Sequence, residues 1–197
     1  MPAACSFPVR TLAAACLLAL ALAVAACAPS AHRAAPASVG EAGSGFSASD
    51  TVAVYSLVIH RLCGPDDTSG GRAPKPVIYL VRSPLVTDPE LRDGVSVAAT
   101  IPAGVQQAVT SRLADLKSKV VWVDHSESVP RDPDTGVVRG GGMIVTLGDI
   151  HPVGRNSVHV IGEVYFANLG AGGRTYVLGN AGGAWRITGT TGVEWMS

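Results

Sequence analysis

The sequence predicts an α+β fold, in which a curved antiparallel sheet has about two helices packed on one face. Three observations support this prediction. Apolar residues recur at helical spacing over 101–116, and apolar and polar residues alternate in short runs from Lys119 onward. The chain has 197 residues, which is about one ordinary domain once an export signal is set aside. Helices early and strands late in the chain are typical of the α+β class.

The folded part is predicted to begin with a helix over residues 51–63. Asp50 is a candidate N-cap, and Gly64 followed by Pro65 ends the helical pattern. The apolar residues at helical spacing are Val52, Tyr55, Ile59 and Leu62. Because the segment is rich in β-branched residues, a strand remains an alternative.

The next elements are a short strand over 77–82 and a second helix over 101–116. Residues 83–99 show no clear period and are assigned to a loop. Proline in the first turn of the second helix suits a helix start. The stripe of this helix consists of Val105, Ala108, Val109, Arg112, Leu113 and Leu116.

From Lys119 onward the chain is predicted to be a run of antiparallel strands. They cover residues 120–123, 142–150, 157–167, 174–178 and 184–190. Two segments rich in Asp, Asn, Pro and Gly, 132–136 and 180–183, are typical of turns between strands.

The strand at 157–167 has two different faces. Val158, Val160, Val164 and Phe166 alternate along one face with Gly162 among them, which predicts the core side. The other face carries His159, Glu163 and Tyr165 beside Ile161. This mixed face is either a solvent face or the wall of a pocket, so these three polar residues are the candidate pocket residues.

The N-terminus is typical of an export signal. Arg10 precedes an apolar run over 11–26, which is too short and too rich in alanine to favour a retained transmembrane helix. The run ends in Val24-Ala25-Ala26-Cys27, which resembles the lipobox of bacterial lipoproteins. The resemblance implies cleavage before Cys27 and acylation of its thiol, for example with palmitate. An ordinary signal peptide that is cut near Ala26 is the alternative.

The expected organisation is a signal peptide at 1–26, a lipidated cysteine and flexible linker at 27–49, and one α+β domain at 50–197. Small residues, Pro and Ser dominate the linker, which predicts a tether with an average reach of about 25 Å. Two or three acyl chains on Cys27 would hold the chain durably at the extracytoplasmic face of a cell membrane. Cys63 is then the only cysteine of the mature domain.

Two further resemblances concern the domain. The ending Gly183-Ala184-Trp185-Arg186-Ile187-Thr188-Gly189-Thr190-Thr191-Gly192 resembles the last strand and tail of uncharacterised exported actinobacterial proteins. The element order weakly resembles the NTF2-like or cystatin-like sheet-around-helix folds, although NTF2-like proteins usually have three helices, two of them before the first strand. Neither resemblance brings a catalytic motif to these positions, and a shared fold does not establish a function.

The net charge and the short sequence motifs limit the partners and reactions that the sequence predicts. Fifteen basic and fifteen acidic residues give a formal net charge of zero, which argues against nucleic acid as a partner. His60 and Cys63 share a helical face and are a candidate base and nucleophile, although a buried thiol is the simpler interpretation. In 124–127, His125 and Glu127 could share one strand face, but a polar strand end is the simpler interpretation.

No catalytic residue, metal site or cofactor is therefore predicted. Asp149, His151 and His159 fall close together near a hairpin end, but they lack a recognised ligand spacing for zinc. The leading hypothesis is a membrane-anchored lipoprotein with a non-catalytic domain that binds an envelope protein or a small ligand.

Two alternatives remain open. One is an NTF2-like hydrolase or isomerase whose sheet-lined pocket contains His159, Glu163 and Tyr165. The other is a structural or assembly role in the envelope, which an exposed apolar patch around Trp195 would favour.

Overall fold

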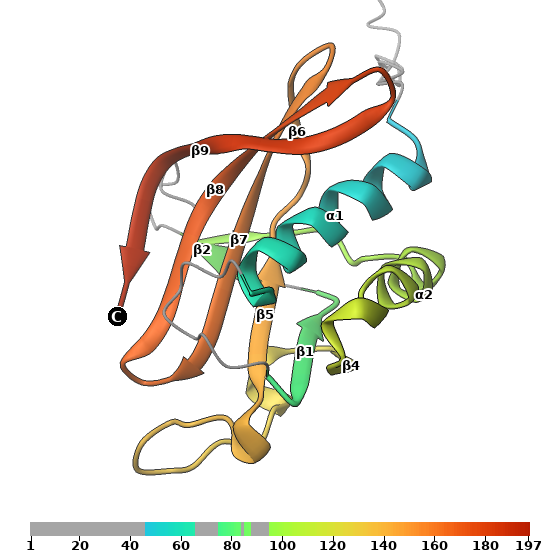
Figure 1. Ribbon diagram of the computed structural model, residues 1–197. Helices are drawn as coiled ribbons and strands as arrows, with labels where there is room; N and C mark the ends of the chain where they lie inside the picture. The colour runs from blue at the N-terminus through green and yellow to red at the C-terminus, as the bar shows by residue number, and fades with distance from the viewer. Residues whose placement is uncertain (1–45, 66–74, 84, 88–94) are drawn as a thin grey trace, which may run out of the picture. The chain divides into compact units, whose positions relative to one another are not determined.

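The computed structural model describes residues 46–65, 75–83, 85–87 and 95–197, and confirms the α+β class (Figure 1). The predicted signal, Cys27 and most of the linker lie outside these residues. The helices are α1 (Ala48–Cys63) and α2 (Ala103–Arg112), with single 3-10 turns η1 (Ala114–Leu116), η2 (Ser126–Ser128) and η3 (Arg139–Gly141). The strands are β1 (Val77–Val81), β2 (Leu85–Thr87), β3 (Val95–Val97), β4 (Lys119–Val123), β5 (Met143–Leu147), β6 (His151–Gly154), β7 (Ser157–Ala167), β8 (Gly170–Ala181) and β9 (Ala184–Met196).

The main sheet is mixed rather than wholly antiparallel. Its strand order is β4-β1-β5-β7-β8-β9, with β6 paired to β7 beside this path. From β5 to β9 every pairing is antiparallel, but β1 runs parallel to both β4 and β5. The prediction of an antiparallel sheet is therefore wrong for these three strands. The chain passes through α2 between β1 and β4, and such a crossover connection returns the next strand parallel.

The N-cap of helix α1 lies three residues before the predicted one. Ser47 is the N-cap, and its hydroxyl accepts a hydrogen bond from the Asp50 amide at 3.2 Å. The Asp50 carboxylate accepts in return from the Ser47 amide at 2.9 Å. This reciprocal capping box satisfies two amides of the first turn, so Asp50 caps the helix from its third position. The helix ends before Gly64, as predicted.

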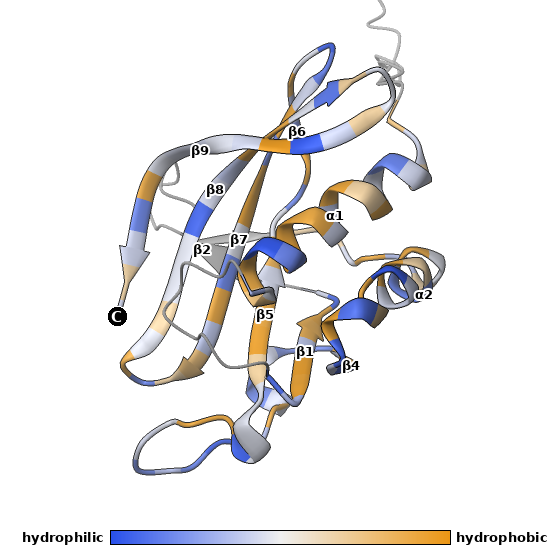
Figure 2. Ribbon diagram, in the orientation of Figure 1, coloured by the Kyte–Doolittle hydropathy of each residue, from blue (hydrophilic) through white to orange (hydrophobic). Residues whose placement is uncertain are grey.

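The predicted core face of β7 is confirmed. Val158, Val160 and Val164 are buried in one cluster with α1, and Val109 and Leu113 of the α2 region join the same cluster. Gly162 lies opposite α1 at a close approach, because an added Cβ would stand 2.8 Å from Val58 Cγ1. Figure 2 shows apolar residues concentrated on α1, β1 and β5, while β9 is mixed.

Several boundaries differ from the predictions. The second helix ends at Arg112 and is followed by η1, and Lys117 in the left-handed conformation closes that turn. The stretch assigned to a loop contains the small β2–β3 sheet, and β6 is an additional strand. Among the described helices, none has the length and apolar character needed to cross a membrane.

Candidate functional site

The three candidate pocket residues lie in a row along β7 on the face away from its buried valines. Residues two apart on a strand are about 7 Å apart and residues four apart about 13 Å, so His159 and Glu163 are well separated. The Glu163 carboxylate accepts a hydrogen bond from the Thr146 hydroxyl at 3.0 Å. Glu163 and Thr146 are direct neighbours across β5 and β7.

Tyr165 lies at the far end of this row, where its side chain forms packing and hydrogen-bond contacts. Its hydroxyl lies 3.0 Å from the Gly136 carbonyl oxygen and 2.9 Å from Asn168 Oδ1. The Arg131 guanidinium lies 4.4 Å from the centroid of the Tyr165 ring. These contacts hold the 129–138 segment against the sheet, and the three hollows described below are lined by other residues.

The two histidines near the hairpin end lie close together, as predicted. His151 and His159 are direct cross-strand neighbours on β6 and β7. Asp149, however, accepts a hydrogen bond from the Ala99 amide at 2.9 Å. No group of three or more histidine, cysteine or acidic side chains suited to a metal ion occurs in the described part of the chain.

The polar side chains that follow β4 also form contacts with nearby residues. Asp124 forms an ion pair with Arg82 at 2.6 Å, and Glu127 lies in η2 rather than on a strand face with His125. Asp132 Oδ1 accepts from the Asp134 amide and from the Thr135 amide and hydroxyl. The carboxylate thereby forms the predicted turn.

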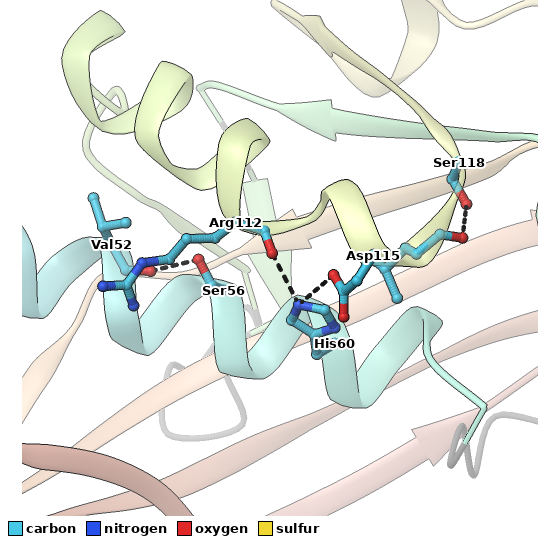
Figure 3. A network of polar contacts seen from close by, with 7 residues as sticks. Val52, Ser56, His60, Arg112, Asp115 and Ser118 are labelled. Carbon is cyan, nitrogen blue, oxygen red and sulfur yellow. Dashed lines mark hydrogen bonds and ion pairs between the residues drawn. The ribbon is translucent and has the colours of Figure 1, made fainter.

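His60 and Cys63 take different partners. His60 Nε2 lies 3.3 Å from the Arg112 carbonyl oxygen and 3.4 Å from Asp115 Oδ1, which joins α1 to the end of α2 (Figure 3). The Cys63 thiol donates instead to Met143 Sδ at 3.5 Å. The geometry therefore places the imidazole in a helix–helix contact and the thiol against the sheet.

Tyr55 provides a prediction for alkaline pH. Its hydroxyl donates to the Gly148 carbonyl oxygen at 3.3 Å, and burial together with the Asp149 charge raises its pKa to about 12. The unfolded chain ionises Tyr55 near pH 10.0, so the unfolded state gains stability first. We expect the free energy of unfolding to fall by about 2–3 kcal/mol between pH 10 and 12. Tyr55→Phe should reduce this slope in chemical unfolding, whereas an unchanged slope would contradict the assignment; Tyr79→Phe is the control.

Three surface hollows stand out among the described residues, and the largest of these three lies between α1 and the edge strand β9, with a volume of about 580 Å³. Its lining combines apolar residues with basic ones: Leu57, His60, Arg61, Pro65, Trp185, Arg186, Ile187, Thr188 and Gly189. A second hollow of about 380 Å³ lies on the other side of Trp185, beside Phe46 and the β6–β7 turn. A third, of about 240 Å³, has a glycine-rich floor between Leu62, Phe166 and Met196.

Trp185 is fixed between the two larger hollows. Its indole N–H donates to Asp50 Oδ1 at 2.7 Å, and its ring meets Phe46 edge to face at 5.4 Å between centroids. Hydrogen bonds from Ser47 and Trp185 lower the pKa of Asp50. The same carboxylate therefore caps α1 and attaches the start of the domain to β9.

The lowered pKa of Asp50 predicts acid sensitivity at this junction. A carboxylate with a lower pKa in the folded state stabilises the fold above its unfolded pKa, and this contribution is lost as the pH falls below about 3.8. We expect Asp50→Asn to be less stable than wild type at pH 7 and to lose less stability between pH 5 and 2.5. Urea unfolding across this range measures both effects. Asp134→Asn, an exposed site, is the control; a slope for Asp50→Asn equal to that of wild type would contradict the assignment.

The α1–β9 hollow was not predicted from the sequence, although His60, which lines it, was a candidate base. Leu57 and Ile187 are far apart in the chain, and the predicted last strand stopped at residue 190, whereas β9 extends to Met196. Trp195 is half-buried, and its indole nitrogen lies where a Cβ on Gly173 would point. No known protein family, curated protein or solved structure matches the chain.

Proposed function

We propose that the chain is a membrane-anchored extracytoplasmic lipoprotein whose domain binds an envelope protein or a small ligand without catalysing a reaction. In this proposal both helices cover one face of a curved sheet and leave β9 accessible. The observation that carries the binding function is the hollow of about 580 Å³ between α1 and β9. It combines an apolar floor with a few polar groups, which is the usual composition of a binding site.

The anchor is supported by the sequence Val24-Ala25-Ala26-Cys27 behind an apolar run. Each buried methylene of an acyl chain contributes about 0.8 kcal/mol, and two or more chains make attachment durable. Eighteen residues separate Cys27 from Phe46, the first described residue. A coil of that length has an average span of about 20–25 Å, which would keep the domain close to the membrane surface.

The non-catalytic character is supported by the contacts of the reactive side chains. The Cys63 thiol donates a hydrogen bond to Met143 Sδ, and His60 connects α1 to the end of α2. Glu163 and Tyr165 contact Thr146 and Gly136. A nucleophile and its base need to be within hydrogen-bond reach of each other, and these contacts direct the candidates toward structural partners instead.

The anchor predicts a specific effect of Cys27→Ser. We expect this variant to lose incorporation of a palmitate analogue and to leave the membrane fraction, since the thiol is the acylated atom. Cys63→Ser is the matched control and should keep both the label and the membrane location. Labelling of the Cys27→Ser variant at the wild-type level would refute the anchor.

Binding is tested separately with a photo-cross-linking amino acid at Leu57 in intact cells. We expect a discrete cross-linked species from this position. Val137, which is exposed outside the hollow, is the control position. Equal, diffuse cross-linking from both positions, or none from Leu57, would contradict a binding role for the hollow.

An assembly role is the second candidate. Leu169 and Met196 are 91% and 76% exposed and both border the smallest hollow, and Val193 is also exposed. Exposed apolar residues of this size favour contact with another protein. A cross-linker at Met196 that captures a discrete partner, while Leu57 captures none, would favour assembly over the binding function.

A further inference from the structure

We propose that the hollow between α1 and β9 binds an extended, acidic segment of a partner protein, which adds to β9 as a further strand. The inference rests on the binding function proposed above and specifies its partner. It makes use of three properties of the hollow: an open strand edge, an apolar floor and a basic rim.

The open edge is β9 itself. It is the last strand in the order of the sheet and pairs with β8 on one side, while no described strand pairs with its other side. Most of its thirteen residues are exposed. An edge strand presents a row of N–H and C=O groups to which another chain can add, and main-chain hydrogen bonds supply the affinity in this mode of peptide recognition.

The apolar floor lies directly beside this edge. Trp185 and Ile187 pair with Asn180 and Leu178, so both belong to the face of β8 that carries the buried Leu178. Both pack against the main core, as does Leu57 of α1. In an added strand every second side chain faces the same way, so alternate apolar residues of the partner would cover this floor.

The basic rim selects the charge of the partner. The ionisable residues that line the hollow are His60, Arg61 and Arg186, and the lining contains no aspartate or glutamate. His60 is engaged with Asp115, and Asp50 contacts Trp185 at one end of the hollow. Arg61 and Arg186 are both exposed. Arg186 projects to the face of β9 opposite Trp185 and Ile187, where the alternate side chains of an added strand would lie. Complementary charge therefore favours acidic residues at those positions.

A second copy of this chain fits the edge less well. If the β9 strands of two copies paired antiparallel, Arg186 of one copy could meet Glu194 of the other only if both side chains lay on the same face of the strand. Arg186 pairs with Gly179, whereas Glu194 forms an ion pair with Arg174. Positions 179 and 174 face opposite sides of β8, because β9 shifts register twice between its ends.

The test uses the full-length chain in detergent and two fluorescein-labelled probes. One is a seven-residue peptide, Thr-Glu-Val-Glu-Val-Glu-Thr, and the other has lysine in place of each glutamate. We expect fluorescence anisotropy to show binding of the acidic peptide and at least tenfold weaker binding of the lysine peptide. Amide hydrogen exchange should slow over residues 185–189 when the acidic peptide is present.

Charge variants of the rim test the recognition directly. Arg186→Gln should weaken binding of the acidic peptide by roughly two- to fivefold, the range of exposed ion pairs. Arg61→Gln should have a smaller effect, because Arg61 lies on the side of the valines. Raising the salt concentration to 0.5 M should weaken binding as well. Arg155→Gln is the matched control, since Arg155 is exposed in the β6–β7 turn and does not line this hollow; it should leave the affinity unchanged.

Three results would overturn the inference. These are equal affinity for the two peptides, no binding of either, and loss of affinity in Arg155→Gln alone. If Leu57 cross-links a partner in cells but the acidic peptide does not bind, the inference fails and the proposed binding function stands. If neither occurs, both fail. A cross-link from Leu57 to a second copy of the chain, or to another residue of the same chain, would also overturn the inference of an acidic partner.

Discussion

Gly162→Val is expected to destabilise the domain by about 2–3 kcal/mol, near the upper end of the range for overpacking a core. A Cβ at residue 162 would stand 2.8 Å from Val58 Cγ1 and 3.0 Å from Tyr176 Cε2. Both neighbours are buried, with Val58 on α1 and Tyr176 on β8. Neither can retreat easily, so the helix and the sheet would have to separate.

The matched control for this substitution is Gly154→Val. Gly154 also lies in a strand, and an added Cβ there would meet no atom within 4 Å. We expect its free energy of unfolding to stay within about 0.5 kcal/mol of wild type. Urea unfolding monitored by circular dichroism compares the two. Similar losses of stability in both variants would show that a strand glycine is required for its backbone conformation. The close approach of α1 to Gly162 would then not be the cause.

The elements that local pattern predicts well are those with one buried face. In α1 the predicted apolar stripe is buried, and Tyr55 and Ile59 lie in the core. In β7 the valines alternate with polar residues as a half-buried strand requires. In both cases the periodicity reports the direction of the core, which is a local property of the sequence.

The elements that were missed depend on contacts across the chain. Gly170-Ala171-Gly172-Gly173 has no strand pattern, yet it begins β8 because β7 and β9 pair with it on both sides. The parallel direction of β1 follows from its neighbours β4 and β5. Its continuous apolar run, Val77–Val81, is typical of parallel strands covered on both faces, and this was the signal available in the sequence.

The candidate site could not be predicted from the sequence for the same reason. The row of His159, Glu163 and Tyr165 was identified from alternation alone, and alternation gives a shared face but no convergence. The α1–β9 hollow instead joins Leu57 of the first helix to Ile187 of the last strand. No spacing rule connects positions so far apart.

Leu113→Ala tests how much of the core depends on the α2 region, and we expect a loss of about 3 kcal/mol in the free energy of unfolding. The predicted stripe over 101–116 suggested a broad apolar face, but Val109 is the only residue within α2 that is fully buried. Leu113 follows the helix and is 0% exposed in the main core cluster. Truncating a fully buried leucine to alanine costs about 2–5 kcal/mol through lost burial and the cavity left behind.

Leu169→Ala supplies the same chemical change at a site that is 91% exposed, and it should alter stability by less than about 0.5 kcal/mol. The comparison also reports on the α1–α2 contact, since His60 bonds the carbonyl oxygen of Arg112, the residue before Leu113. If Leu113 anchors this end of α2, its loss should speed amide exchange in both α2 and the last turn of α1. Exchange that changes in α2 alone would mean that α1 is held by the sheet independently. A stability loss equal to that of Leu169→Ala would place α2 outside the cooperative core.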